Sequence, residues 1–247
     1  MSQARKGEAY GRHARQRGEW WLPAEPGPRP TVVLVHGGYW RDAYDLTLED
    51  RVAHDLAARG FLVWNVDYRP SSAGWPSTLE DVAAAYDHLA TDERVDPARI
   101  SVVGHSAGGH LALWLASRHN LPTGAPGSGS TAPRPAAVVA QAPVAALADG
   151  ARARLGDGGD AVQALVGGEP DEVPERYAVA DPVQLRPTGI RTACVHAPDD
   201  PLVPIEQSET YCRAADLATL VRVGAGHFEH LDPASTSCAA MRQGLAW

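Results

Sequence analysis

The sequence predicts an α/β protein with a mostly parallel central sheet and helices on both of its faces. Short β-branched or apolar runs, such as 31–35 and 61–66, alternate along the chain with helical patterns of about a dozen residues. The run over 31–35 lacks the apolar–polar alternation of a half-exposed strand. Such a run is typical of a strand that is buried on both faces, as in a parallel sheet.

The remaining elements follow in order from the same patterns. We expect residues 1–18 to form a loose arm or one short helix, within an N-terminal arm over 1–30. A Gly-, Pro- and Ser-rich surface loop is expected over 120–135, and a small irregular cap insertion over about 145–187. One domain over 1–247 is expected, with strands at 31–35, 61–66, 99–103, 136–142, 190–196 and 219–223 and helices at 46–59, 78–90, 110–117, 206–215 and 233–245.

Composition excludes several classes of function. The net charge of −8 argues against nucleic acid or an anionic membrane surface as a partner. The three cysteines are widely spaced, with no Cys-x-x-Cys pair, and predict reduced thiols instead of a disulfide framework or a zinc site. No apolar stretch approaches the ~20 residues of a membrane span. We therefore expect a soluble cytoplasmic protein, monomeric or homodimeric, with a small-molecule substrate and no cofactor.

The motif Gly-His-Ser-Ala-Gly-Gly at 104–109 carries the strongest functional signal. It follows the β-type run at 99–103 and opens the helical pattern at 110–117. A serine on a tight, glycine-flanked turn between strand and helix is the arrangement of a nucleophile elbow. Small residues are needed there because strand and helix pack closely around a strained backbone. The pattern predicts Ser106 as a catalytic nucleophile.

A serine nucleophile requires a base and an acid, and both follow Ser106 at predicted strand ends. The strand at 190–196 leads to Asp199 and Asp200, and the strand at 219–223 leads to His227. The turn Asp-Pro-Leu-Val-Pro favours Asp200 as the acid, with Asp199 as the alternative. His230 competes with His227 as the base, and the two could also form a metal-binding pair, although no third ligand is evident.

The oxyanion hole is expected from backbone N–H groups on two loops. One donor is the N–H of Ala107, the residue after the predicted nucleophile. The other comes from the loop His-Gly-Gly-Tyr-Trp at 36–40, where we expect Gly38 and Tyr39 to line the hole. His36 and His105 are expected to brace their own loops, and the other histidines are assigned no chemistry.

These motifs together resemble a known family. The elbow at 104–109, the Asp-Tyr-Arg at 67–69 and the loops of Asp200 and His227 resemble the esterase/lipase branch of the α/β-hydrolases. Lipases of the hormone-sensitive type usually carry His-Gly-Gly-Gly where this chain has His-Gly-Gly-Tyr-Trp. That loop is similar to the one in kynurenine formamidases (arylformamidases), so the resemblance implies hydrolysis of N-formyl-kynurenine to kynurenine and formate.

The resemblance covers about residues 31–247 and implies the α/β-hydrolase fold, but it leaves the substrate open. We expect the segments 120–135 and 145–187 to shape the acyl and leaving-group pockets. A flat aniline leaving group would suit an aromatic pocket, for which Trp40, Tyr68, Trp75 and Phe228 are candidates, with Tyr39 beside them. The alternatives are a carboxylesterase for short-chain or aryl esters and a non-catalytic ligand-binding member of the fold.

Overall fold

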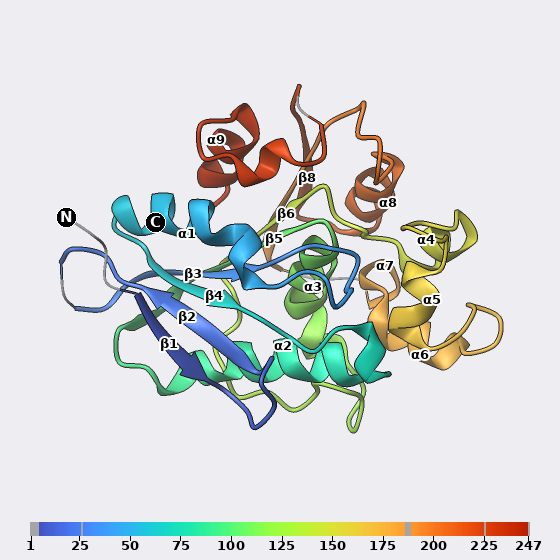
Figure 1. Ribbon diagram of the computed structural model, residues 1–247, viewed down its shortest axis with the longest axis horizontal. Helices are drawn as coiled ribbons and strands as arrows, with labels where there is room; N and C mark the ends of the chain where they lie inside the picture. Colours follow the sequence, from blue (N-terminus) through green and yellow to red (C-terminus); the bar gives the residue numbers. More distant parts are fainter. Residues whose placement is uncertain (1–4, 26, 186–188, 225, 247) are drawn as a thin grey trace.

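The computed structural model describes residues 5–25, 27–185, 189–224 and 226–246. They contain one eight-stranded sheet with the order β1-β2-β4-β3-β5-β6-β7-β8 (Figure 1). Neighbouring strands pair in parallel along the order β4-β3-β5-β6-β7-β8. At one edge of the sheet, β2 pairs antiparallel with both β1 and β4. The expected mostly parallel sheet is therefore confirmed.

The elements lie close to the predicted ones. The strands are β1 (Arg5–Ala9), β2 (Arg17–Trp21), β3 (Arg29–Val35), β4 (Leu62–Val66), β5 (Val95–His105), β6 (Ala137–Gln141), β7 (Arg191–His196) and β8 (Ala218–Arg222). The α-helices are α1 (Asp50–Ala58), α2 (Ser77–Asp87), α3 (Ala107–Ser117), α4 (Leu147–Arg152), α5 (Ala161–Val166), α6 (Pro174–Ala180), α7 (Pro182–Leu185), α8 (Glu206–Ala214) and α9 (Thr236–Gln243). Short 3-10 turns extend several of them, as at Leu46–Glu49 before α1.

Successive residues of the central strands point alternately into two apolar layers, one on each face of the sheet. In β3, Val32 and Leu34 pack with α1 and α9, and Val33 and Val35 pack with the layer that contains α2 and α3. Figure 1 shows α1 and α9 together on one side of the sheet, with α2 on the other. Side chains that alternate between two covered faces explain why the central strands are apolar along their whole length.

The N-terminal segment differs from the expectation. In place of a loose arm or short helix, residues 5–21 form a hairpin of β1 and β2, and β2 extends the sheet beside β4. Trp20 stacks on Trp64 of β4 with ring centroids 4.5 Å apart, and both rings are fully buried. The tryptophan pair joins this hairpin to the core. Residues 1–4 of the expected arm lie outside the described residues.

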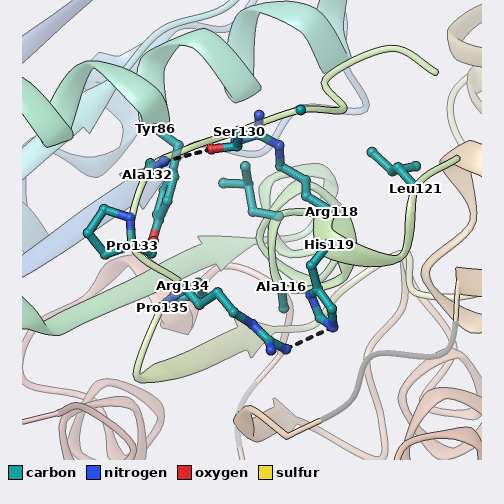
Figure 2. A pocket seen from close by; sticks show the side chains of 12 residues that line it. Tyr86, Ala116, Arg118, His119, Leu121, Ser130, Ala132, Pro133, Arg134 and Pro135 are labelled. Atoms are coloured by element: carbon teal, nitrogen blue, oxygen red, sulfur yellow. Dashed lines mark hydrogen bonds between the residues drawn. The ribbon is translucent and has the colours of Figure 1, made fainter. Parts of the chain in front are cut away.

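The loop at 120–135 lies far from its expected place. It follows the C-terminal end of α3, whereas Ser106 precedes the N-terminal end of the same helix. Its residues line a separate cavity of about 300 Å³, in which Arg134 Nη2 approaches His119 Nε2 at 2.8 Å (Figure 2). This loop therefore does not line the cavity of Ser106, contrary to our expectation.

The described part of the segment at 145–187 contains the short helices α4 to α7. The short helices α4 to α7 gather at one end of the sheet (Figure 1). His110 on α3 donates from Nε2 to the carbonyl oxygen of Ala180, and Trp114 donates to that of Val179, so α3 holds this segment in place. Residues 186 and 187, at its expected end, lie outside the described residues. Within the described ranges, no helix has the length and apolar character to cross a bilayer.

Candidate active site

Ser106 lies between β5 and α3 in a backbone conformation that few non-glycine residues adopt. Its φ is +57° and its ψ is −118°. Its N–H donates to the carbonyl oxygen of Gln141 on the neighbouring strand (2.8 Å), and its own carbonyl accepts from the N–H of His110 (3.1 Å). These bonds offset the backbone strain, which costs roughly 1–3 kcal/mol. They fix the serine at the carboxyl edge of the sheet.

Two glycines of the motif are required by close packing. A Cβ atom on Gly104 would lie 2.1 Å from the carbonyl oxygen of Gly108. A Cβ atom on Gly108 would lie 2.0 Å from the carbonyl oxygen of Val35 at the end of β3. Both contacts are with main-chain atoms, which cannot move aside as a flexible side chain can. The motif therefore permits α3 to start directly against β3.

His227 and Asp200 contact one another directly at this edge of the sheet. Nδ1 of His227 lies 2.7 Å from Oδ2 of Asp200, an arrangement in which Nδ1–H donates and Nε2 remains an acceptor. Oδ1 of Asp200 accepts from the N–H groups of Leu202 and Val203, each at 2.9 Å. Asp199, the alternative acid, is exposed and is not the carboxylate that contacts His227.

The environment keeps Asp200 ionised. Burial opposes its charge, but hydrogen bonds from His196 and His227 outweigh burial and hold the pKa of Asp200 well below its usual value. Our sequence analysis gave His196 no role. It is fully buried, with Nε2 at 2.9 Å from the carbonyl oxygen of Val203 and 3.5 Å from Oδ2 of Asp200, and Nδ1 at 2.7 Å from Oγ of Ser208. The only feature of the sequence that could have indicated a role for His196 is its position at the end of β7.

His105 braces a loop other than its own. Its Nε2 lies 2.8 Å from the carbonyl oxygen of His227, so the elbow holds the loop of the predicted base. Burial and the neighbouring imidazoles of His227 and His230 hold the pKa of His105 well below its usual value. A neutral His105 can donate that hydrogen bond from Nε2 without adding charge beside His227.

His230 lies apart from this arrangement. It is fully buried, its Nδ1 contacts Ser237 Oγ, and burial together with His227 lowers its pKa to about 3. Among the described residues, no group of three or more histidine, cysteine or acidic side chains could hold a metal ion. Of the two candidate bases, His227 is the one whose ring nitrogen lies beside Asp200.

The loop at 36–40 reaches the same cavity through two strained residues. Tyr39 and Trp40 have φ values of +48° and +55°. Gly38 and Tyr39 line the cavity, and Ala107 is the first residue of α3, where a backbone N–H has no partner within the helix. The Tyr39 hydroxyl donates to the carbonyl oxygen of Leu202 (2.8 Å), which joins this loop to the loop of Asp200. His36 Nδ1 donates to the carbonyl oxygen of Gly37 (2.8 Å).

Ser106 and His227 open into one cavity of about 270 Å³ with mainly apolar walls. Its aromatic residues are Tyr39, Tyr44 and Phe228, and Phe228 is 64% exposed. The cap-like segment contributes Asp157, as expected of part of that segment. The described residues that line the cavity are Gly38, Tyr39, Tyr44, Leu48, His105, Ser106, Asp157, Leu202, His227, Phe228 and Leu231.

Three of the four aromatic candidates do not line this cavity. Trp40 is 1% exposed and packs edge-on against His110, and Tyr68 is 1% exposed, stacks on His36 and donates its hydroxyl to the carbonyl oxygen of His36 (2.9 Å). Trp75 packs against the core beneath the guanidinium of Arg176. Phe228 remains, and Tyr44 is an aromatic residue that our sequence analysis missed.

Comparison with known proteins places this geometry in a family. The BD-FAE family model matches residues 20–214, which is most of the chain. This chain belongs to the BD-FAE family. The solved structure of a truncated carbohydrate esterase from gut microbiota superposes with a TM-score of 0.82 at 20% sequence identity, over 97% of this chain and 94% of that one. The α/β-hydrolase fold is thereby confirmed.

Curated relatives match over shorter stretches. The kynurenine formamidase of Meyerozyma guilliermondii is 31% identical over 92 residues, which are 37% of this chain and 35% of that protein. Carboxylesterase NlhH of Mycobacterium tuberculosis is 35% identical over 103 residues, which are 39% of this chain and 32% of that protein. The matches span about a third of these relatives' length. The family match and these partial matches place the chain in the esterase branch of the α/β-hydrolases.

Proposed function

We propose that this chain is a serine hydrolase in which Ser106 is the nucleophile, His227 the base and Asp200 the acid. The observation that carries the proposal is the 2.7 Å contact between His227 and Asp200 at the wall of the cavity that contains Ser106. A serine hydroxyl attacks a carbonyl only when a base accepts its proton. Nε2 of His227 is left as an acceptor for that proton because Nδ1 donates to Asp200.

The reaction then proceeds in two half-reactions. Oγ of Ser106 bonds to the carbonyl carbon as its proton passes to His227, and the N–H groups of Ala107 and of the loop of Gly38 and Tyr39 stabilise the oxyanion. The bond to the leaving group breaks as His227 returns the proton to its nitrogen or oxygen. Water then attacks the acyl-enzyme by the same route and releases the acid.

For the substrate we propose an N-formyl aryl amine, with N-formyl-kynurenine as the first candidate. Two features support it: the His-Gly-Gly-Tyr-Trp loop and a small cavity with the rings of Tyr39, Tyr44 and Phe228. A formyl group needs little space at Ser106, and the rings suit a flat aniline. The similarity to kynurenine formamidases, although it covers a minority of the chain, favours the same substrate class.

A carboxylesterase for short-chain or aryl esters is the second candidate. The similarity to carboxylesterase NlhH supports it, and the same three residues would serve. The two candidates differ only in the bond that is cleaved. Substrate comparison therefore has to separate them.

The test gives purified enzyme N-formyl-kynurenine and p-nitrophenyl acetate side by side, together with Ser106→Ala and the matched control Ser130→Ala. Ser130 is an exposed serine beside the cavity of Figure 2. We expect a kcat/KM for the formamide well above that for the ester, abolished only in Ser106→Ala. Ester hydrolysis alone would select the carboxylesterase. Activity that survives Ser106→Ala, or failure of Ser106 to react with a fluorophosphonate, would overturn the mechanism.

A further inference from the structure

We propose that the cavity of Ser106 selects substrates whose leaving group carries a positive charge, and that Asp157 recognises that charge. This inference rests on the proposed function, because it names the substrate class of the same cavity. Asp157 lies in the turn between α4 and α5 and lines the cavity together with Ser106 and His227. It therefore faces the space in which a leaving group would lie.

In the described part of the chain, no cation pairs with the carboxylate of Asp157. Among the described residues, none of the ion pairs or hydrogen bonds involves it. It is nevertheless near Tyr39, because the pKa of that hydroxyl is raised by burial and, to a lesser extent, by Asp200 and Asp157. The nearby basic residues of these loops have other partners: Arg41 pairs with Asp160, and Arg154 pairs with Glu169. A substrate cation would meet a carboxylate that no protein cation neutralises.

The charge balance of the whole cavity points the same way. No lysine or arginine is present among the described residues that line it. Asp200 adds a second carboxylate behind His227, and hydrogen bonds hold it ionised. Asp157 is exposed, so water and salt screen its charge, but a cavity wall with unbalanced negative charge still attracts cations and repels anions. An anionic group on the substrate would therefore meet no lysine or arginine among the described residues of the cavity wall.

Aromatic rings supply a second means of cation recognition. Tyr39 lines the cavity near Asp157, and Phe228 and Tyr44 are 64% and 39% exposed. An ammonium group near the face of such a ring is attracted by the negative potential of its π-electrons. Aromatic faces beside a carboxylate thus suit an alkylammonium that lies a few bonds from a flat aryl group.

Contacts between loops hold Asp157 at this position. Arg41 of the loop after β3 pairs with Asp160, three residues after Asp157. A Cβ atom on Gly156 would lie 3.5 Å from the Tyr39 ring, so the turn lies directly against that ring. The same tyrosine bonds to the loop of Asp200 through Leu202. The turn that carries Asp157 is therefore held against the loops that carry the predicted triad.

Recognition of a cation by Asp157 predicts different rates for three formamides that share the same reacting group but differ in charge. N-formyl-kynuramine carries an ammonium, N-formyl-kynurenine carries an ammonium and a carboxylate, and 2′-formamidopropiophenone is neutral. We expect kcat/KM to be highest for N-formyl-kynuramine. Because exposed ion pairs and cation–π contacts are modest, the preference for the cation over the neutral compound should be about three- to tenfold and should shrink in 1 M salt.

The experiment measures kcat/KM for the three formamides with wild type, Asp157→Asn and Asp171→Asn. Asp171 is an exposed carboxylate of the same segment that does not line the cavity. We expect the preference for the cation to disappear in Asp157→Asn and to persist in Asp171→Asn. Thermal unfolding of both variants checks that the fold is retained. Equal preference in wild type and Asp157→Asn, or a preference for the zwitterion over the cation, would overturn the inference while hydrolysis still supported the proposed function.

A binding measurement separates failure of the inference from failure of the function. Calorimetric titration of Ser106→Ala, and of Ser106→Ala with Asp157→Asn, uses the same three compounds without turnover. If wild type hydrolyses none of them, the formamidase proposal fails, and the titration still decides the inference. Tighter binding of N-formyl-kynuramine that requires Asp157 supports it, and equal binding of the three compounds overturns it.

Discussion

Glu49 allows a quantitative prediction of how stability depends on pH. This residue ends the 3-10 turn before α1, next to Leu48 at the wall of the Ser106 cavity. It is 1% exposed, and among the described residues neither carboxylate oxygen has a hydrogen-bond partner. Burial without a partner raises its pKa to about 8. The folded protein therefore holds a proton at Glu49 that the unfolded chain releases near its ordinary pKa of 4.5.

The sign and size of the effect follow from this difference. Between pH 4.5 and 8 the folded state binds more protons than the unfolded state, so the free energy of unfolding falls as the pH rises. One pKa unit corresponds to about 1.4 kcal/mol, so the loss approaches about 5 kcal/mol above pH 8, with about 3 kcal/mol already lost at pH 7. Glu49→Gln cannot ionise and removes this contribution.

Urea unfolding of wild type and Glu49→Gln at several pH values from 5 to 9 tests the calculation. The difference between the two curves cancels the contributions of histidines and other carboxylates. We expect the variant to gain on the wild type by several kcal/mol over this range, and Glu206→Gln, at an exposed glutamate, to gain nothing. Parallel curves for wild type and Glu49→Gln would refute the reasoning.

Three further predictions concern the site. Asp200→Asn should lower kcat for p-nitrophenyl acetate by up to about 10⁴-fold, because His227 loses the acceptor that fixes its tautomer, and Asp199→Asn should leave kcat unchanged. His196→Phe should lower kcat about 10- to 100-fold with little change in KM, because Asp200 loses a neighbour that positions it. His196→Gln should restore part of the lost kcat, and an effect confined to KM would contradict a positioning role. Gly108→Ala should prevent stable folding because its Cβ would lie 2.0 Å from a main-chain oxygen. Gly150→Ala should be tolerated, because its Cβ would lie 3.3 Å from the nearest atom, which belongs to a side chain. Thermal unfolding and soluble yield compare the two variants.

The central strands and helices could be predicted because their signals are local. The run at 31–35 needed no knowledge of its neighbours to indicate a buried strand. The hairpin of β1 and β2 could not be found in this way, because Arg5–Ala9 is almost wholly exposed and has no apolar alternation. Its place depends on the pairing of β2 with β4 and on Trp20 stacking against Trp64, which are contacts between distant segments.

In the candidate site, the positions of the three predicted catalytic residues could be predicted from the sequence, but the directions of the loop side chains could not. Ser106, Asp200 and His227 follow predicted strands, and strands that run parallel end at one edge of the sheet, so chain order alone indicated that they would meet. The direction of each loop side chain carried no such signal. Trp40 was expected to contact substrate, but its φ of +55° accompanies a side chain that is buried against His110. Sequence neighbours on a strained loop can face opposite ways.

Hydrogen bonds and ion pairs between loops explain why the cavity of Ser106 is the least predictable part of this protein. The loop of Tyr39 is bonded to the loop of Asp200 through Leu202, and the elbow is bonded to the loop of His227 through His105. In each bond a side chain from one loop contacts a main-chain carbonyl of another, which any residue type supplies. The acceptor therefore leaves no trace in the sequence. The ion pair of Arg41 and Asp160, by which the turn of Asp157 is held to the loop after β3, is a charged pair 119 residues apart among many charged residues. The candidate catalytic residues at strand ends are thus encoded locally, whereas the shape and charge of the cavity depend on how these loops contact one another.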